Sequence, residues 1–343
     1  MNTNQKRKIS IIFGNHNGLR FLKEFLDSVY LQTYKNFEII MVDNVSVDTS
    51  IDFVSKNFPS VKIIANKKDL GFAGGSNIGF NACSGDYVAI ANNDIILQSD
   101  LLEKLMEAYN DIPNLGAVQP KVELKKQPGK LDACGSFWTN TGFNYHYGIY
   151  KDANLPIYNN RIPIYSLKGV FMLMPRSVIE KVGLFDDDFW CFFEETDFCH
   201  RVWLAGYECW YYPGSMLYHN LGGTLAKERV SYVQFHSFKN RLCSYLKNLG
   251  LIEALKVLPV YLLLNIILSI SYLAKLNFAN FLMIYKAILW NVVNLGNTMR
   301  KRSKVQKNIR IKTDKEIFKK VRRNPRASYY YYLLKGLEHY VDD

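Results

Sequence analysis

The feature that most constrains the fold of this chain is the alternation of short apolar runs and helical segments in its first hundred residues. The apolar runs cover Ile9–Phe13, Phe37–Val42, Val61–Ala65 and Tyr87–Ala91. The segments 19–31, 50–58 and 75–83 lie between them, and the spacing of their apolar residues is typical of helices. Alternating strands and helices form βαβ units, in which helices cover both faces of a parallel sheet. The sequence therefore predicts an α/β fold with a Rossmann-like, mostly parallel central sheet.

Polar clusters directly follow three of these predicted strands. Asn15 follows the first strand, Asp43-Asn44 the second, and Asn92-Asn93-Asp94 the fourth. Ligands of open parallel sheets bind beyond the carboxyl ends of the strands, so we expect one site to collect these side chains. A carboxylate beside amide oxygens also suits a hard divalent cation at Asp94. Taken one at a time, the clusters are equally compatible with turns, and Asp48 and Ser50 with a helix cap.

The charge of the chain is divided unevenly. Residues 1–224 hold 21 Lys+Arg and 24 Asp+Glu, whereas residues 225–343 hold 22 and 7, which together give the formal net charge of +12. A protein that binds nucleic acid through its main fold would not usually be basic only at its end, so we expect no nucleic-acid partner. A chain with 48% hydrophobic and 22% charged residues is neither disordered nor a polytopic membrane protein.

The sequence favours a reduced, cytoplasmic location. Its six cysteines form no C-x-x-C pair, which argues against a zinc site or a redox motif. The apolar run that follows Lys6-Arg7-Lys8 is too short for the core of a signal peptide. We therefore expect a protein of the cytoplasmic side.

The C-terminal third has the composition of a membrane-surface element. Residues 257–274 carry no charge, residues 276–299 predict an amphipathic helix, and residues 300–326 hold 13 Lys+Arg against 2 Asp+Glu. An amphipathic helix beside a polybasic run is typical of a segment that lies on an anionic membrane. We expect peripheral membrane contact through 257–326. The alternative is a helical hairpin that packs on the main domain and carries a solvated basic tail.

Two further segments carry candidate chemistry. The glycine-rich segment 69–79 opens a predicted helix, where glycine allows close approach to a ligand and the helix N-terminus favours anions. The segment 190–201 places three carboxylates within four residues, beside the aromatic residues at 190, 192 and 193. A partly desolvated carboxylate is what a general base requires. Acidic residues in a first helical turn are otherwise only partners of the helix dipole.

In their order along residues 8–225, these motifs resemble the inverting nucleotide-sugar glycosyltransferases of family 2, which have the GT-A fold. The branch most similar to this chain includes rhamnosyltransferases of bacterial surface-polysaccharide biosynthesis. The resemblance is carried by Asn15-His16-Asn17-Gly18, Asp43-Asn44-x-Ser46-x-Asp48, Gly71-Phe72-Ala73-Gly74-Gly75-x-Asn77, Asn92-Asn93-Asp94, Gly183-Leu184-Phe185-Asp186, Glu194-Glu195-x-Asp197 and His219. No single motif is specific, but their order is.

The resemblance implies roles for individual residues. Glu195 would be the general base, assisted by Glu194 and Asp197, and Asp94 and His219 would hold Mn²⁺ or Mg²⁺. Trp190 and Gly169 would contact the acceptor. The nucleotide sugar would be bound by Asn15, Asp43, Asn44, Gly71, Gly74, Asn77, Asn92 and Asn93. Three positions depart from the family pattern: Asp69, Asn92 in place of an aspartate, and Glu195 in place of an aspartate.

The resemblance also implies a domain organisation. A GT-A catalytic domain would cover residues 1–235, with a nucleotide-sugar half at 1–118 and an acceptor half at 119–235. Residues 236–343 would form a helical, basic, membrane-associating region. In the acceptor half, 164–174 predicts a strand that contains Lys168-Gly169, and 194–204 predicts a helix.

The implied reaction moves a sugar from a nucleoside diphosphate sugar, such as dTDP-rhamnose or a UDP-sugar, to a hydroxyl of a lipid-linked or polysaccharide acceptor. The sugar and the acceptor depend on loops at 120–165 and 219–236, and homo-oligomer formation stays open. One alternative is a different nucleotide-sugar or nucleotidyl enzyme on the same scaffold. Another is a non-catalytic, membrane-associated subunit or scaffold of a polysaccharide assembly complex.

Overall fold

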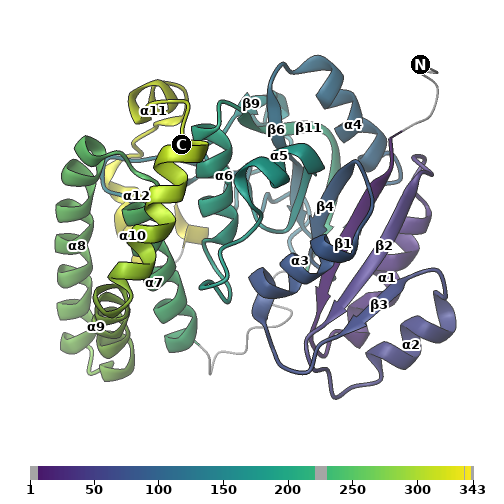
Figure 1. Ribbon diagram of the computed structural model, residues 1–343, viewed down its shortest axis with the longest axis horizontal. Coiled ribbons are helices and arrows are strands. Elements are labelled where there is room, and N and C mark those ends of the chain that lie inside the picture. Colours follow the sequence, from purple (N-terminus) through teal and green to yellow (C-terminus); the bar gives the residue numbers. More distant parts are fainter. Residues whose placement is uncertain (1–6, 221–229, 336, 341–343) are drawn as a thin grey trace.

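The computed structural model describes residues 7–220, 230–335 and 337–340; part of the predicted loop at 219–236 lies outside them. Its centre is a nine-stranded sheet with the order β3-β2-β1-β4-β10-β6-β11-β5, in which β9 pairs with β11. Figure 1 shows helices on both faces of this sheet and a group of C-terminal helices beside it. The predicted α/β fold with a mostly parallel central sheet and a helical C-terminal extension is confirmed.

The N-terminal half follows the predicted alternation closely, because each buried strand is a continuous apolar run. Strands β3, β2, β1 and β4 are parallel, and the register places Asn15 beside Asp43 at the carboxyl ends of β1 and β2. The elements are β1 (Ile9–Asn15), α1 (Leu19–Tyr30), β2 (Phe37–Asp43), α2 (Ser50–Asn57), β3 (Lys62–Ala65), α3 (Gly71–Ala82) and β4 (Tyr87–Ala91).

The second half extends the sheet with strands of mixed direction. Strand β10 is antiparallel to β4 and β6, β11 is parallel to β6, and β5 is antiparallel to β11. The elements are β5 (Ile95–Leu97), α4 (Leu101–Asp111), β6 (Leu115–Leu124), β7 (Ser136–Phe137), β8 (Tyr145–His146), β9 (Ile162–Pro163), β10 (Phe171–Pro175), α5 (Arg176–Val182), α6 (Glu194–Leu204) and β11 (Glu208–His219).

Two strands of this half begin or end at other residues than the sequence predicts. The strand expected over 164–174 is only β10 at Phe171–Pro175, so Lys168 and Gly169 precede the strand instead of lying inside it. Residues 164–168 bond instead to residues outside β10; the Ile164 amide, for example, donates to the Cys209 carbonyl. His219 is the last residue of β11, which is longer than the sequence predicts.

The C-terminal region forms helices that share the core of the acceptor half. Trp138 stacks on Phe318 with ring centres 4.5 Å apart, and its amide donates to the carbonyl of Val321. Within the described residues, the C-terminal helices therefore differ from residues 119–235 in composition but share one core with them. The elements are α7 (Val230–Asn248), α8 (Leu251–Ala274), α9 (Phe278–Val293), α10 (Leu295–Lys304), a π-helical turn at Val305–Ile309, α11 (Asp314–Val321) and α12 (Ala327–Lys335).

Helices α8 and α9 lie at the end of the molecule opposite β2 and β3, and they are packed with their polar side chains inward (Figure 1). In α9, Asn291 is buried and donates from Nδ2 to the carbonyl of Lys239 in α7. In α8, Asn265 and Ser269 are likewise buried. Lys256 and Lys286 point outward, but most of the exposed side chains are apolar: Leu255, Leu263, Ile266, Ile267, Ile270, Leu273, Phe278, Leu282, Leu289, Val292 and Val293. This is the reverse of a helix at the surface of a water-soluble domain.

Candidate active site

A row of hydrogen-bonded side chains crosses the carboxyl ends of β4, β1 and β2. Asn93 Nδ2 donates to Asn15 Oδ1 at 2.8 Å, and Asn15 Nδ2 donates to Asp43 Oδ2 at 2.9 Å. Ser46 closes the row by donating to Asp43 from its amide and its hydroxyl. The parallel register brings these residues together, as predicted from the polar clusters that follow the strands.

Asp43 and Asn44 are nearly inaccessible in this arrangement. Asp43 is 1% exposed and both its oxygens accept bonds from the protein, so a contact with a nucleoside would require them to be shared. Asn44 donates to the carbonyl of Gly71 and accepts from Asn66. These two residues therefore build the floor of the site and join it to α3.

The glycines of the glycine-rich segment have two roles. Some allow close packing, and one leaves its backbone open to a ligand. Gly71 has φ +63°, and a Cβ there would lie 2.2 Å from the carbonyl oxygen of Trp190. Gly79 packs α3 on the sheet, because a Cβ there would meet Ile12 at 2.3 Å. Gly74 lies in the first turn of α3 and is partly exposed, which leaves its backbone open to a ligand.

Asn77 has a role that differs from the expected contact with the nucleotide sugar. Its Nδ2 donates to the carbonyl of Phe185 and to Asp187, and its Oδ1 accepts from the amide of Phe185. The side chain thus fixes the turn at 185–187 to α3. The sequence could not reveal this pairing because the partners are more than 100 positions apart.

On the neighbouring side of the sheet, Asp94 and His219 converge. Asp94 follows β4, and its Oδ1 lies 3.4 Å from Nε2 of His219 at the end of β11. The other ring nitrogen, Nδ1, lies 2.8 Å from Asp132, which is 1% exposed. Burial disfavours the charged imidazole, but the hydrogen bonds to Asp132 and Asp94 outweigh it and raise the pKa of His219 to about 9.

Asp94 and His219 fit the role of two ligands of one divalent cation. Adjacent ligands of an octahedral ion at about 2.1 Å lie about 3 Å apart, close to the observed separation. A carboxylate and an imidazole suit Mn²⁺, and Asp132 on the second ring nitrogen is the partner that orients a ligating histidine. Among the residues that the structure describes, no group of three His, Cys, Asp or Glu side chains is arranged around one point. Substrate oxygens and water would therefore complete the coordination.

Asp132 also holds Lys168, which connects this pair to the acidic helix. Lys168 Nζ lies 3.1 Å from Asp132 Oδ1, and its charge acts on Glu195. Burial opposes the ionisation of Asp132, but Lys168 and His219 hold its pKa below the ordinary value. Neither residue could be assigned to the site from the sequence. Asp132 lies in a region without helical or strand periodicity, and Lys168 was notable only as the neighbour of Gly169, a predicted site residue.

Glu194 and Glu195 begin α6 in different surroundings. Glu194 is 6% exposed, and its Oε2 has no hydrogen-bond partner among the described residues. Burial, reinforced by the charge of Glu195, raises the pKa of Glu194 well above its ordinary value. Glu195 is partly exposed and lies beside Gly169, where a Cβ would be 3.6 Å from Glu195 Cγ. Burial also raises the pKa of Glu195, against hydrogen bonds that include one from Thr196.

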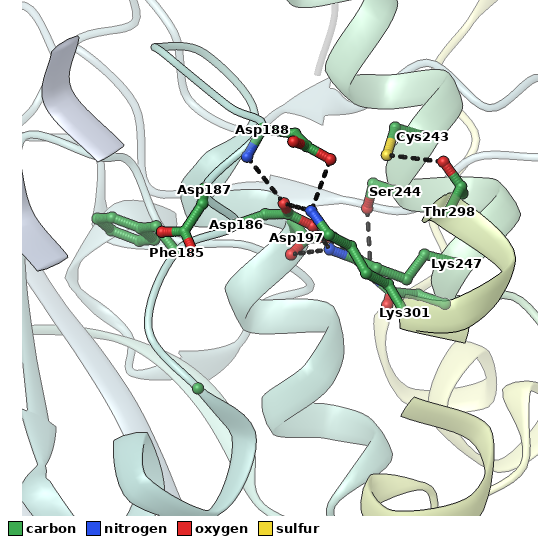
Figure 2. A network of polar contacts seen from close by, with 12 residues as sticks. Phe185, Asp186, Asp187, Asp188, Asp197, Cys243, Ser244, Lys247, Thr298 and Lys301 are labelled. Atoms are coloured by element: carbon green, nitrogen blue, oxygen red, sulfur yellow. Dashed lines mark hydrogen bonds and ion pairs between the residues drawn. The ribbon is translucent and has the colours of Figure 1, made fainter. Parts of the chain in front are cut away.

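Asp197, the third carboxylate of this segment, lies away from any space for a substrate. It is fully buried and faces the C-terminal helices, where Lys247 donates to it (Figure 2). Arg201 and Asn248 also donate to its oxygens. A carboxylate enclosed in this way cannot touch a substrate. Its role is to fix α6, and therefore Glu195, against α7.

The remaining predicted residues lie at the rim of the site. Trp190 is partly exposed and packs on Gly71 and on Tyr232 of α7, with ring centres 5.1 Å apart in the second contact. Asn92 lies between β4 and β5 and donates its amide to the carbonyl of Val170. Their contacts with donor or acceptor stay predictions.

Comparisons with known proteins agree that this chain is similar to glycosyltransferases. The family model described as glycosyl transferase family 2 matches residues 10–183, about half of the chain. An uncharacterised glycosyltransferase of Haemophilus influenzae is 24% identical over 269 residues, which cover 74% of this chain and 80% of that protein. The N-acetylglucosaminyl-diphospho-decaprenol L-rhamnosyltransferase of Mycobacterium tuberculosis is 23% identical over 240 residues, or 63% and 76% of the two chains.

Two solved structures show the same fold. GalNAc-T7 with UDP, GalNAc and Mn²⁺ is 15% identical with a TM-score of 0.57; the match covers 71% of this chain and about half (48%) of that one. TarS 1–349 of S. aureus in complex with UDP-GlcNAc is 16% identical with a TM-score of 0.51, over 73% and 69% of the two chains. At this level of identity, the likeness concerns the fold alone.

Proposed function

Because the chain belongs to glycosyl transferase family 2, we propose that it is an inverting enzyme of cell-surface glycan assembly. It moves a sugar from a nucleoside diphosphate sugar, such as dTDP-rhamnose or a UDP-sugar, to a hydroxyl of a lipid-linked or polysaccharide acceptor. The relative from M. tuberculosis, whose name describes a lipid diphosphate acceptor, supports the acceptor class. The observation that carries the proposal is the partly exposed Glu195, joined through Lys168 and Asp132 to the pair Asp94–His219.

The reaction is a single displacement. Glu195 takes the proton of the acceptor hydroxyl, and the hydroxyl oxygen forms a bond to the anomeric carbon while the bond to the diphosphate oxygen breaks. Attack from the side opposite the diphosphate inverts the anomeric centre. The raised pKa of Glu195 makes its carboxylate a stronger base than an exposed one. Asp94 and His219 would hold the divalent cation, which when bound neutralises charge on the leaving diphosphate.

The base assignment is tested by Glu195→Gln, with Glu180→Gln on the surface of α5 as the matched control. We expect Glu195→Gln to lower kcat at least 10³-fold while the affinity for UDP or dTDP with Mn²⁺ changes less than twofold, because the amide cannot accept the proton. NMR of the product would show the inverted anomer. Turnover of Glu195→Gln at the level of Glu180→Gln, or a retained anomeric configuration, contradicts the mechanism.

We also propose that the enzyme binds the cytoplasmic face of the cell membrane through α8 and α9. The outward apolar side chains of this hairpin support this, as does the charge of residues 251–313, which hold ten Lys+Arg and one acidic residue. By length and composition alone, the described helices include one that is long enough and apolar enough to cross a bilayer, α8. The count becomes two if the bent pair of α9 and the following helix, Leu295–Ile309, forms one span.

Vesicle sedimentation tests the membrane proposal. Ile267→Glu combined with Leu289→Glu places two charges on the outward face, and binding to vesicles with 30% anionic lipid should fall at least tenfold. Leu31→Glu is the control, since Leu31 is an exposed apolar residue directly after the distant α1. Equal binding of the double variant and the control contradicts membrane contact through this hairpin.

A further inference from the structure

Arg241 of α7 lies against the start of the helix that carries Glu195. Its guanidinium carbon is 5.0 Å from the ring centre of Phe193, which directly precedes Glu194, and 5.1 Å from that of Phe143. The adjacent Asn240 donates from Nδ2 to the carbonyls of Cys191 and Phe192 at 2.9 and 2.7 Å. Phe192 and Phe193 both have positive φ, so α7 holds a strained turn at the entrance of α6. The position of Arg241 is therefore fixed relative to Glu195.

The charge of Arg241 is not balanced within the described part of the chain. No carboxylate there forms an ion pair with it, and its buried Nε has no hydrogen-bond acceptor. Its guanidinium contacts the rings of Phe193 and Phe143, which carry no charge. Arg201 in α6 illustrates the usual arrangement, with Asp197 and three backbone carbonyls as partners. A half-buried cation without a counter-charge is costly, and an anionic ligand would remove that cost.

A second cation and a neutral histidine lie nearby. Lys168 is 31% exposed, and the carboxylate with which it pairs, Asp132, also pairs with His219. Burial lowers the pKa of His146 to about 3, and the charges of Lys168 and Arg241 lower it further. The segment that holds His146 is tied to α6, since Asn144 Nδ2 lies 3.4 Å from Thr196 Oγ1. Arg241, at Phe193, and Lys168, next to the glycine that faces Glu195, thus both lie near the start of α6.

We propose that Arg241 and Lys168 form an acceptor-side anion subsite that binds the phosphate or diphosphate of a lipid-linked acceptor. This inference rests on the proposed function. Arg241 contacts Phe143, which packs on Tyr261 of α8 with ring centres 5.2 Å apart, so the subsite adjoins the helix whose outward face is apolar. The arginine fork matches phosphate geometry with two parallel bonds. The subsite is separate from Asp94 and His219, which are assigned to the diphosphate of the donor.

The test is a binding experiment on the full chain in detergent, with farnesyl diphosphate, farnesol, inorganic pyrophosphate and UDP with Mn²⁺ as probes. The wild type should bind farnesyl diphosphate at least tenfold tighter than farnesol or pyrophosphate. Arg241→Gln should lose at least tenfold in affinity for farnesyl diphosphate and less than twofold for UDP. Arg241→Lys, which keeps the charge without the fork, should lie between the two. If Arg241→Gln does not fold, the intermediate loss expected for Arg241→Lys provides the comparison between farnesyl diphosphate and UDP.

Four outcomes, the last of them kinetic, overturn the subsite. If Arg241→Gln binds farnesyl diphosphate as tightly as the wild type, Arg241 does not form the subsite. If its affinity for UDP falls as much as its affinity for farnesyl diphosphate, Arg241 belongs to the donor site instead. If binding to anionic vesicles falls as much as binding to farnesyl diphosphate, the charge of Arg241 binds membrane lipid head groups instead. Failure of the proposed function is distinguishable, because a protein that binds farnesyl diphosphate selectively but transfers no sugar refutes the enzyme and not the subsite. Transfer by Arg241→Gln with an unchanged acceptor KM refutes the subsite alone.

Discussion

Replacement of Lys247 by methionine tests whether the C-terminal helices are part of the catalytic structure. Lys247 lies on α7 with its side chain 4% exposed, and its Nζ is 2.5 Å from Asp186 and 3.0 Å from Asp197 (Figure 2). Asp186 belongs to the turn that precedes α6, and Asp197 belongs to α6 itself. Methionine keeps the length of the side chain and removes only the charge, which leaves two buried carboxylates short of a partner.

The expected loss of stability depends on the partners that the two carboxylates keep. Removing one member of a buried ion pair costs about 3–5 kcal/mol. Asp186 keeps Lys301, and Asp197 keeps Arg201 and Asn248, so the loss should lie at the lower end, about 3 kcal/mol. Lys301→Met is the matched control. Its side chain is 27% exposed and its second partner, Asp188, is 28% exposed, so about 1 kcal/mol is expected.

The assay is urea unfolding at pH 7, repeated at decreasing pH. Burial opposes the ionisation of Asp186 and Asp197, but the nearby cations, Lys247 first, hold both pKa values below the ordinary range. Carboxylates with lowered pKa stabilise the fold above their unfolded pKa of about 3.9, and this contribution disappears as the pH falls through the folded pKa. The deficit of Lys247→Met should therefore be complete above about pH 5 and shrink in acid. A deficit no larger than that of Lys301→Met at pH 7 would refute the reasoning.

Two further predictions concern single side chains. Asp132→Asn should raise the Kd for Mn²⁺ by about 10–100-fold, because His219 loses the carboxylate that orients it; an unchanged Kd in a calorimetric titration would contradict the metal assignment. Burial lowers the pKa of His200 to about 4, so wild-type stability should fall by up to about 3 kcal/mol from pH 6.5 to 4, where the unfolded chain binds a proton that the folded one does not. His200→Phe should lose the share of this pH dependence that His200 contributes, so the difference in stability between the two proteins should change between pH 6.5 and 4; an identical profile in the two proteins would contradict it.

Much of the site could be predicted because its residues follow strands of a parallel sheet. The polar residues after β1, β2 and β4 were expected at one edge, and Asn15, Asp43 and Asn93 do form one hydrogen-bonded row there. The acidic helix was predicted with its correct limits, 194–204. The individual roles within these motifs could not be predicted. The sequence does not distinguish Asp197, which is fully buried, from Glu195, which is partly exposed two positions earlier.

The sequence by itself determined the class of fold, the alternation of strands and helices in the first half and the place of the site. It could do so because apolar periodicity and the polar residues at strand ends are local signals. Only the tertiary structure decided that Asp132 joins His219 to Lys168, that Asn77 fixes a turn, and that α8 and α9 expose their apolar faces. These features depend on contacts between residues far apart in the chain, or on which helix face the neighbouring helices cover. No local pattern encodes that choice, since a polar or apolar face is buried according to what packs against it.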